Sequence, residues 1–258
     1  MNIKLIRADL PANLKTLELH PFADFHLGDP HCDFKHIIEM INHVRDTENA
    51  YCILNGDLMD SAVRQSIGDI YSANLQPMEQ LQQCVKIFDP IKSKILAVTG
   101  NGNHEARIYK NDGIDMTRLM CAQLGIENKY TETTAVLFIR FGENWRKKKM
   151  FYSAYITHGS GGGRKEGGKV NRIADLASIV DVDLYIHSHT HLPLTFKETF
   201  FRIDSKNNAV TPVTKLFVNT SAQLNYGGYG DIQGYKPAST DNPVIFLDGT
   251  KHKMNCIV

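Results

Sequence analysis

Short apolar runs that end in aspartate, asparagine or histidine recur along this chain, and they constrain its fold more than any other feature. "AYCIL" at 50–54 runs into Asn55-Gly56-Asp57, and "KILAV" at 94–98 is followed by glycine and asparagine. Apolar runs of this length that are closed by turn residues indicate buried strands. Each predicted strand therefore delivers polar groups to the point where it ends.

Helical patterns alternate with these strands. After Asp33, "FKHIIEMINHVRDT" has apolar residues at helical spacing, and "MEQLQQCVKIFDP" repeats the pattern until Pro90 stops it. Further along, "AVLFIRF" and "FYSAYIT" predict a hairpin, "NRIADLASIV" a helix, and "DLYI", "KLFVN" and "NPVIFLDG" further strands. Strands that alternate with helices early and form hairpins late predict an α/β fold with mixed sheets.

Composition narrows the class of protein. With 258 residues, 42% of them hydrophobic and 22% charged, the chain has the composition of a packed globular protein. Without a repeat or a linker, we expect a single domain over residues 1–258. The net charge of +1 gives no global attraction for nucleic acid, so any polyanion contact must be local.

The cysteines and the N-terminus bear on the compartment. The five cysteines are scattered and never form the close pairs of zinc ribbons or redox motifs; they are Cys32, Cys52, Cys84, Cys121 and Cys256. The N-terminal sequence lacks the apolar region of a signal peptide, and we find no stretch of the roughly 20 apolar residues that a membrane span needs. We therefore expect a cytoplasmic location and no membrane partner.

The polar residues at the strand ends form one predicted constellation. The carboxyl ends of strands line the ligand crevice in open α/β sheets. The residues that we expect to meet there are Asp24, His26, Asp57, Asp60, Asn103, His104, His158, His187, His189 and His191. Carboxylate, amide and imidazole groups suit manganese, iron, zinc or similar ions. They are too many for one ion, and two ions about 3.5–4 Å apart that share a carboxylate would use them to activate a water for attack at phosphorus.

These blocks resemble, in order and position, those of the calcineurin-like metallophosphoesterases. That family runs Asp-x-His, Gly-Asp-x-x-Asp, Gly-Asn-His-Asp/Glu, His and Gly-His-x-His, and here the blocks are "DFH", "GDLMD", "GNHE", "THG" and "SHTH". "GDLMD" is most similar to the Mre11/SbcD-like phosphodiesterase and nuclease branch. The resemblance implies a four-layer αββα sandwich of two mixed sheets flanked by helices. It also implies two divalent metal ions, with Mn²⁺ preferred over Fe, Zn, Ni or Mg.

The resemblance further implies a role for each matching residue. The metal ligands would be Asp24, His26 and His191 for the first ion and Asn103, His158 and His189 for the second. Asp57 would bridge the two ions. His104 would lie near the leaving oxygen as general acid or transition-state stabiliser, while a metal-bound hydroxide attacks phosphorus.

Two residues near the last blocks leave alternatives open. Ser188 replaces the family's glycine, and His187 creates a second His-x-His frame. We prefer His189 and His191, because the following "HTHLP" fits the family frame better. Asp60 is interpreted as a hydrogen-bond partner of a ligand or as a helix cap.

A glycine-rich basic segment at 160–172 follows His158. Its "GRKEGGK" fits the Gly-x-x-x-x-Gly-Lys of a phosphate-binding loop, but Val170 replaces the required serine or threonine. We therefore interpret the segment as a flap whose Arg164 and Lys165 contact substrate phosphate, with a solvent loop as the alternative. Arg107, three residues after His104, is a further candidate for phosphate contact.

Two more loops and the remaining histidines complete the candidate features. The tyrosine- and glycine-rich loop at 222–241, with Tyr226, Tyr229 and Tyr235, either stacks on bases or packs on the domain. The basic "RKKK" at 146–149 is expected at a hairpin tip. The histidines outside the blocks are interpreted as surface or core residues; they are His20, His31, His36, His43 and His252.

The sequence thus favours a dinuclear metal-dependent phosphoesterase. Within that class we favour a phosphodiesterase that acts on DNA, RNA or nucleotides, because of the "GDLMD" block, the basic flap and the tyrosine loop. A phosphomonoesterase or protein phosphatase of the same fold is the first alternative. A non-catalytic metal-binding module is the second, although every ligand position holds a chemically competent residue.

Overall fold

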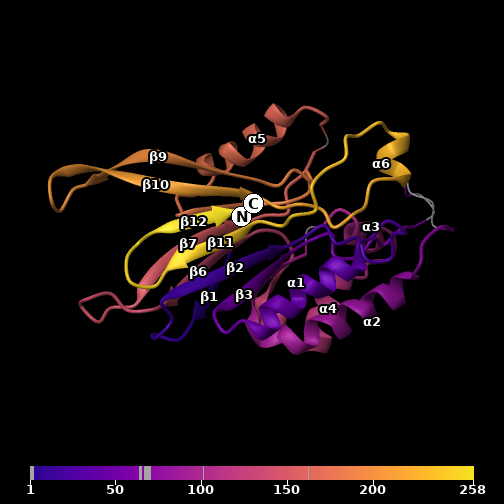
Figure 1. The fold of residues 1–258 in the computed structure, drawn as a ribbon, viewed down its shortest axis with the longest axis horizontal. Helices are drawn as coiled ribbons and strands as arrows, with labels where there is room; N and C mark the ends of the chain where they lie inside the picture. Colours follow the sequence, from indigo (N-terminus) through magenta and orange to yellow (C-terminus); the bar gives the residue numbers. More distant parts are fainter. Residues whose placement is uncertain (1–2, 64–65, 67–70, 101, 162) are drawn as a thin grey trace.

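Two six-stranded mixed sheets form the centre of the molecule (Figure 1). The computed structural model describes residues 3–63, 66, 71–100, 102–161 and 163–258, apart from the side chain of Tyr229. The first sheet runs, in spatial order, β1 (Lys4–Asp9), β6 (Ala135–Phe141), β7 (Met150–Ile156), β8 (Leu184–His187), β10 (Ala209–Asn219) and β9 (Leu194–Asp204). The second runs β12 (Met254–Ile257), β11 (Val244–Asp248), β2 (Thr16–Phe22), β3 (Ala50–Asn55), β4 (Ile95–Thr99) and β5 (Tyr130–Thr131).

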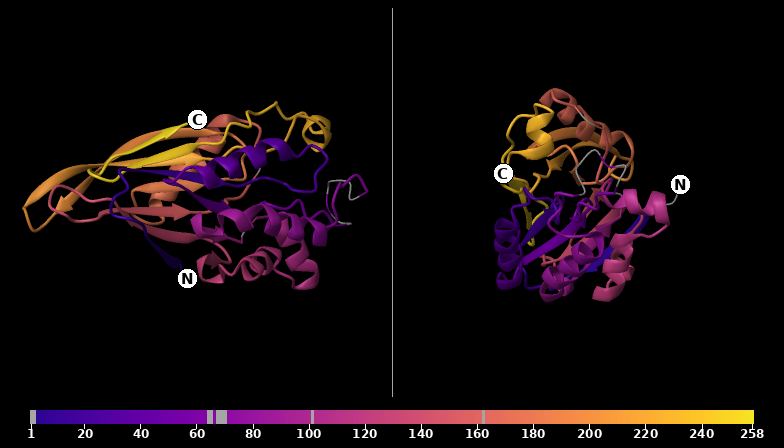
Figure 2. Two further views of the ribbon diagram at one scale, coloured as in Figure 1. Left: turned by 60° about the horizontal axis from the view of Figure 1, so that its bottom comes forward. Right: turned by 90° about the vertical axis from the view of Figure 1, so that its right-hand side faces the viewer.

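Helices cover the outer faces of both sheets. In Figures 1 and 2, α1 (Phe34–Asp46), α2 (Pro77–Phe88) and α4 (Met116–Leu124) lie along the second sheet, and α5 (Glu166–Ala174) lies on the opposite side, against the first. The remaining helices are α3 (Glu105–Asp112), α6 (Gly228–Ile232), and the 3₁₀ turns η1 (Asp89–Lys94), η2 (Glu127–Lys129) and η3 (Asp175–Ser178). The predicted αββα order of layers is confirmed.

Each interface between layers has its own apolar core. Leu17 and Leu19 of β2 point between the sheets, where they join a buried cluster with residues of the first sheet such as Leu137 and Ile156. Phe22 lies in a different cluster together with Ile41 of α1. Because side chains alternate along a strand, β2 therefore faces the other sheet with its odd-numbered residues and α1 with its even-numbered ones.

The predicted elements fall close to their expected positions. Helix α1 begins after Asp33, whose side chain accepts a hydrogen bond from the backbone N–H of His36 at 3.1 Å. The strands β2, β3, β4 and β5 run parallel to one another, so their carboxyl ends share one edge of the sheet. In the first sheet β7, β8 and β10 are likewise parallel. Parallel pairing thus brings the polar residues that follow these strands to the same edge of each sheet.

Two regions differ from the sequence-based expectation. Helix α5 begins at Glu166, inside the segment predicted as a flap, because Ile173 is buried and anchors this turn-rich stretch against Tyr185 and Phe217. Gly162 of the flap lies outside the described residues. The second difference is the long hairpin of β9 and β10, which pair over eleven residues each and extend the first sheet, whereas only 215–219 was predicted as strand.

No helix in the described part of the chain has the length and apolar character required to cross a bilayer. The basic "RKKK" segment lies at the predicted position between β6 and β7, where Arg146 stacks over Trp145 at 4.4 Å from the ring centre. Trp145 is 82% exposed. This tip is therefore a solvent-facing feature of the hairpin.

Candidate metal centre at the strand ends

Polar side chains from the ends of β2, β3, β7 and β8, and from the start of α3, lie together in one place. We call this set the strand-end site; its members are Asp24, His26, Asp57, His104, His158, His189 and His191. Asp24, Asp57 and His158 are almost fully buried, and the side chain of His191 is 36% exposed. The sequence-predicted convergence of these strand ends is therefore present in the fold.

The potential ligands among the described residues fall into three groups at this site, two of which contain a buried carboxylate; the third joins His26 to Asp60 and His104. Asp24, His26 and His191 offer ligand atoms within 4.8 Å of one another, and so do Asp57, His158 and His189. These two groups touch, because the Nε2 atom of His158 lies 3.1 Å from Oδ2 of Asp57 and 4.0 Å from Oδ1 of Asp24. The arrangement thus provides two adjacent places for a cation, with the two carboxylates between them.

The backbone at this site is held in an unusual conformation. Five of these residues have left-handed φ angles: Asp24 (53°), His26 (49°), Asp57 (50°), His189 (68°) and His191 (54°). Such angles are uncommon outside glycine and cost of order 1 kcal/mol or more each. The surrounding structure therefore has to stabilise them.

Hydrogen bonds between loops supply that stabilisation. The loops after β2 and β3 run side by side, since Asp24 N–H donates to the carbonyl of Gly56 at 3.1 Å and His26 N–H to that of Asp57 at 3.0 Å. Ser188 N–H donates in the same way to His158 O at 3.1 Å, which joins the loops after β7 and β8. The strained ligand loops are therefore fixed by backbone pairing beyond the strands themselves.

Asn55 connects four strand ends, although the sequence indicated only a turn residue there. Its amide nitrogen donates to Thr157 O at 2.8 Å and to Ser188 Oγ at 2.7 Å, and its side-chain oxygen accepts from Thr99 Oγ1 at 2.8 Å. Its backbone carbonyl is 2.7 Å from Nδ1 of His158. This last contact fixes the ring so that Nε2 points at the carboxylates, a role that no motif in the sequence signalled.

The hydrogen bonds of the Asp24 carboxylate show whether a cation fits the first group. Its Oδ2 accepts hydrogen bonds from His189 N–H at 3.0 Å and Thr220 Oγ1 at 3.3 Å, whereas its buried Oδ1 accepts none from the described residues. The Nε2 atom of His191 is 3.3 Å from that oxygen. A buried charged oxygen that accepts no hydrogen bond is expensive, so a cation between Oδ1 and this imidazole fits the position.

The charges of the site act on one another strongly. Burial opposes ionisation, but the imidazole of His191 holds the pKa of Asp24 below its usual value, and that of His158 holds the pKa of Asp57 well below. In the opposite sense, burial favours neutral His158, yet the carboxylate of Asp57 raises its pKa to about 10. Burial lowers the pKa of His26 to about 3 and of His189 to about 4, so both rings are neutral and can donate lone pairs.

His104 belongs to a separate hydrogen-bonded chain at the edge of the site. Its Nδ1 lies 2.9 Å from Oδ1 of Asp60, and its Nε2 is 3.1 Å from the guanidinium of Arg107. Burial lowers the pKa of His104, but the hydrogen bond to Asp60 outweighs this and raises it above the ordinary value. The interpretation of Asp60 as a hydrogen-bond partner agrees with this contact.

Glu105 stabilises the loop of Asp57 by hydrogen bonds to its backbone. Its carboxylate accepts hydrogen bonds from Asp57 N–H at 3.1 Å and Met59 N–H at 2.9 Å, and burial raises its pKa to about 7. Gly102 lets this carboxylate approach, because a Cβ there would lie 2.1 Å from Oε2 of Glu105. Two glutamate oxygens thus hold the backbone that presents Asp57.

Two predicted candidates lie differently from the buried ligands. Asn103 is exposed and precedes His104 in the chain. His187 is buried with Nδ1 2.7 Å from Oδ1 of Asn219, and it belongs to neither of the two ligand groups. The frame of His189 and His191 is therefore the one that reaches the carboxylates.

The flap and the tyrosine-rich loop contact each other. The guanidinium of Arg164 donates to Gln233 O at 2.6 Å and lies over the ring of Tyr235 at 5.7 Å. Lys165 is exposed at the start of α5, and Tyr226 is 53% exposed with its hydroxyl 3.2 Å from Asp231. The side chain of Tyr229 lies outside the described set. Arg107 thus touches His104, a member of the strand-end site.

Comparison with known proteins agrees with this geometry. A family model described as calcineurin-like phosphoesterase matches residues 25–193, which is more than half of the chain. None of the curated proteins compared with the chain matches it.

Three solved structures match most of the chain at low sequence identity and low TM-score. A metallophosphoesterase from Sphaerobacter thermophilus is 12% identical with a TM-score of 0.41, over 90% of this chain and 84% of its own. A predicted phosphoesterase from Streptococcus pneumoniae TIGR4 is 12% identical with a TM-score of 0.38, over 95% and 90%. Wild-type Vps29 from Entamoeba histolytica, complexed with zinc, is 11% identical with a TM-score of 0.39, over 93% and 97%.

Proposed function

We propose, because the chain belongs to the calcineurin-like phosphoesterase family, that the strand-end site hydrolyses phosphodiesters of nucleic acids or nucleotides with two divalent metal ions. The observation that carries the proposal is the pair of adjacent ligand groups, Asp24, His26 and His191 beside Asp57, His158 and His189. The donors are carboxylate oxygens and imidazole nitrogens, which suit Mn²⁺, Fe, Zn or Ni ions and, less well, Mg²⁺. Mn²⁺ is our first choice.

We assign each group one ion. Asp24, His26 and His191 hold the first, and His158 and His189 hold the second, with Asn103 completing its shell from the rim. Asp57 would be shared by the two ions, since its carboxylate lies 3.1 Å from His158 and interacts electrostatically with His26 of the first group. Ions bound here would lower the pKa of a water molecule and neutralise the charge of a phosphate group.

His104 moves the proton in this scheme. Its Nδ1 donates to Asp60, which fixes the ring, and its Nε2 accepts a hydrogen bond from the guanidinium of Arg107, so Nε2 can carry the transferred proton only when Arg107 turns to the substrate phosphate. The raised pKa keeps a larger fraction of the ring protonated at neutral pH, as a general acid for the leaving oxygen requires. Asp60 therefore acts as a positioning residue for His104.

Basic side chains around the rim bind the phosphate and its substituents. Arg107 is half-buried beside His104 and can pair with a non-bridging phosphate oxygen. Arg164 and Lys165 stand further out, where Arg164 links the flap to Tyr235 of the 222–241 loop. Arg164 and Tyr235 form a flat surface on which a base or another group attached to the phosphate could stack. A diester carries such a second group, so this contact supports a diester over a monoester.

The test is a comparison of two substrates on the Mn²⁺-loaded full chain. Hydrolysis of bis-p-nitrophenyl phosphate and of p-nitrophenyl phosphate is measured side by side, followed by single-stranded DNA and cyclic nucleotides. We expect kcat/KM for the diester to exceed that for the monoester by about tenfold or more, a difference of roughly 1.4 kcal/mol in transition-state binding.

The alternatives give distinct results. A preference for the monoester would sink the diester proposal and favour a phosphomonoesterase or a protein phosphatase. A metal-loaded chain that hydrolysed neither compound would overturn the catalytic proposal altogether and favour a metal-binding module.

A further inference from the structure

A second group of potential metal ligands lies on β2 and α1, away from the strand-end site. Glu18 and His20 are two residues apart on β2, so their side chains point to the same face, the one that α1 covers. His43 approaches them from α1, between the buried positions Ile41 and Val44. The three side chains offer ligand atoms within 4.8 Å of one another. We call them the β2–α1 cluster.

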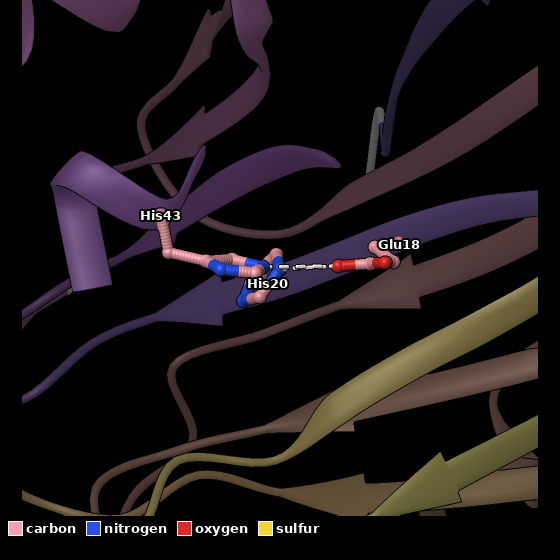
Figure 3. A group of neighbouring side chains, drawn as sticks. All are labelled: Glu18, His20 and His43. Atoms are coloured by element: carbon pink, nitrogen blue, oxygen red, sulfur yellow. Dashed lines mark hydrogen bonds and ion pairs between the residues drawn. The ribbon is translucent and has the colours of Figure 1, made fainter. Parts of the chain in front are cut away.

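The three ligand atoms are arranged around one point. Oε2 of Glu18 lies 3.0 Å from Nε2 of His43 and 3.7 Å from Nε2 of His20. Figure 3 shows both imidazoles and the carboxylate pointing toward one another. The centres of the two rings are 5.2 Å apart, and the rings are tilted by 59°. Ligands on a tetrahedral zinc ion, with bonds of about 2.0–2.1 Å, are separated by roughly 3.3 Å. The distances from Glu18 Oε2 to the two imidazole nitrogens, 3.0 Å and 3.7 Å, are respectively slightly shorter and slightly longer than this value.

The state of His20 points to a missing partner. His20 is 6% exposed, and its Nε2 makes no hydrogen bond to the described residues although it faces Glu18. A buried polar atom of this kind costs about 1–3 kcal/mol when it is left unsatisfied. Burial, with a smaller contribution from the nearby His43, lowers the pKa of His20 to about 4, so the ring is neutral and has a lone pair to donate.

We propose that the β2–α1 cluster binds one zinc-class divalent cation through Glu18 Oε2, His20 Nε2 and His43 Nε2. Two imidazoles and one carboxylate form a borderline donor set that favours Zn²⁺, Co²⁺ or Ni²⁺ over Mg²⁺ or Ca²⁺. The side chain of His43 is half-exposed, whereas that of His20 is buried. The fourth position of the ion therefore opens toward solvent on the His43 side.

This site is separate from the strand-end site in position and in role. The two groups share no residue, and His20 lies within β2 whereas Asp24 lies beyond its end. The ligands come from one strand and one helix, so a bound ion would fasten α1 to the sheet. The resulting stabilisation rises with the concentration of free zinc, because the ion binds only the folded chain.

The experiment counts zinc per chain in the full-length protein. Metal-stripped wild type, His43→Ala and the matched control His36→Ala are dialysed against buffered free Zn²⁺, and bound zinc is measured by atomic emission. His36 lies on the same helix and outside the cluster, next to Glu39. We expect the wild type and His36→Ala to bind one zinc more per chain than His43→Ala. With Co²⁺ as the probe, His43→Ala should lack one component of the visible absorption.

Two further measurements keep the result interpretable. His43→Ala should retain the Mn²⁺-dependent hydrolysis of the wild type, which shows that it is folded, and Glu18→Gln should lose the same single zinc. Equal zinc content in wild type, His43→Ala and Glu18→Gln would overturn the proposal and leave the cluster as a hydrogen-bonded packing contact. A loss in His36→Ala as well would also overturn it, since the zinc would then be held by the helix surface.

Discussion

Strand β2 carries two groups of potential metal ligands that are built in different ways. The strand-end site gathers Asp24 and His26, just beyond β2, with residues from the ends of other strands, and its backbone is held in left-handed conformations. The β2–α1 cluster uses Glu18 and His20 from the regular part of the same strand and His43 from a regular helix. The first group therefore depends on loops fixed by the whole fold, and the second on one strand–helix contact.

This difference has consequences for how each group responds to change. Loop ligands with strained φ angles are sensitive to substitutions that disturb neighbouring loops. Such substitutions include replacements of glycines that are not themselves ligands. Ligands on regular elements tolerate such changes, because packing of α1 on β2 already places them. Substitutions that affect one group and spare the other are the natural way to test the comparison.

Among variants that keep the proposed metal ligands, the largest effect is expected from His104→Asn. Removing the imidazole takes away the proton donor but leaves Asp24, Asp57 and the other proposed ligands in place, so kcat for a diester should fall by about 10²–10⁴. Bound Mn²⁺ should stay at the wild-type level, and His36→Asn should have no effect on either quantity. Full activity in His104→Asn would remove this residue from the mechanism.

Gly56→Ala should damage the strand-end site through the backbone. Gly56 has φ +81°, and a Cβ there would lie 2.8 Å from Nδ1 of His158 and 2.9 Å from the backbone of Gly102. We expect a loss of about 1–3 kcal/mol in the free energy of unfolding, together with weaker Mn²⁺ binding. Urea titration measures the first quantity.

Gly167→Ala is the matched control for that substitution. Gly167 lies in α5 and a Cβ there meets nothing within 4 Å, so alanine should stabilise the helix by about 0.5–1 kcal/mol. Equal effects of the two substitutions would contradict the view that close loop packing fixes the strand-end site.

His20→Gln tests the β2–α1 cluster through pH, with zinc removed by a chelator. Because the pKa of folded His20 is lowered to about 4 from 6.5, the unfolded chain binds a proton more readily between these values. The contribution of neutral His20 to the free energy of unfolding is therefore complete above about pH 6.5. It is lost as the pH falls toward 4, by at most about 3 kcal/mol. His20→Gln should flatten this part of the profile, whereas His36→Gln should keep it. An unchanged slope in His20→Gln would contradict a buried neutral His20.

The smallest expected effect is a difference in KM between alanine variants of the two arginines, Arg107 and Arg164. Arg107 touches His104, whereas Arg164 is engaged with Gln233 and Tyr235. Arg107→Ala should raise KM for a diester about tenfold, or roughly 1.4 kcal/mol, and Arg164→Ala by less than about threefold. Steady-state kinetics on the Mn²⁺-loaded variants measures both values. A larger effect at Arg164 would move the phosphate contact to the flap.

The sequence predicted the strand-end site better than the rest of the molecule. Strand-end residues such as Asp57 and His158 follow apolar runs with clear turn signals, and parallel pairing brings such ends together. Asn55, Glu105 and Asn219 were not assigned roles, because their hydrogen bonds join segments that only the fold brings close. The same reason conceals the β2–α1 cluster: Glu18 and His20 have no neighbouring ligand until α1 packs over them.

Two fold features were also beyond the sequence patterns. The β9–β10 hairpin is half-exposed and mixes polar with aromatic residues, so its outer part lacks the apolar run that predicted the inner strands. The flap appeared flexible because of its glycines, yet burial of Ile173 extends α5 back to Glu166. In both cases tertiary packing overrides local preference.

The most direct test of the proposed function is a Mn²⁺ titration of the metal-stripped wild type beside Asp57→Asn, with hydrolysis of bis-p-nitrophenyl phosphate as the readout. We predict that wild-type activity is absent without metal and reaches a plateau as two equivalents of Mn²⁺ bind, and that Asp57→Asn stays inactive throughout. Wild-type turnover that is independent of metal, or full activity in Asp57→Asn, would contradict a dinuclear site centred on this carboxylate.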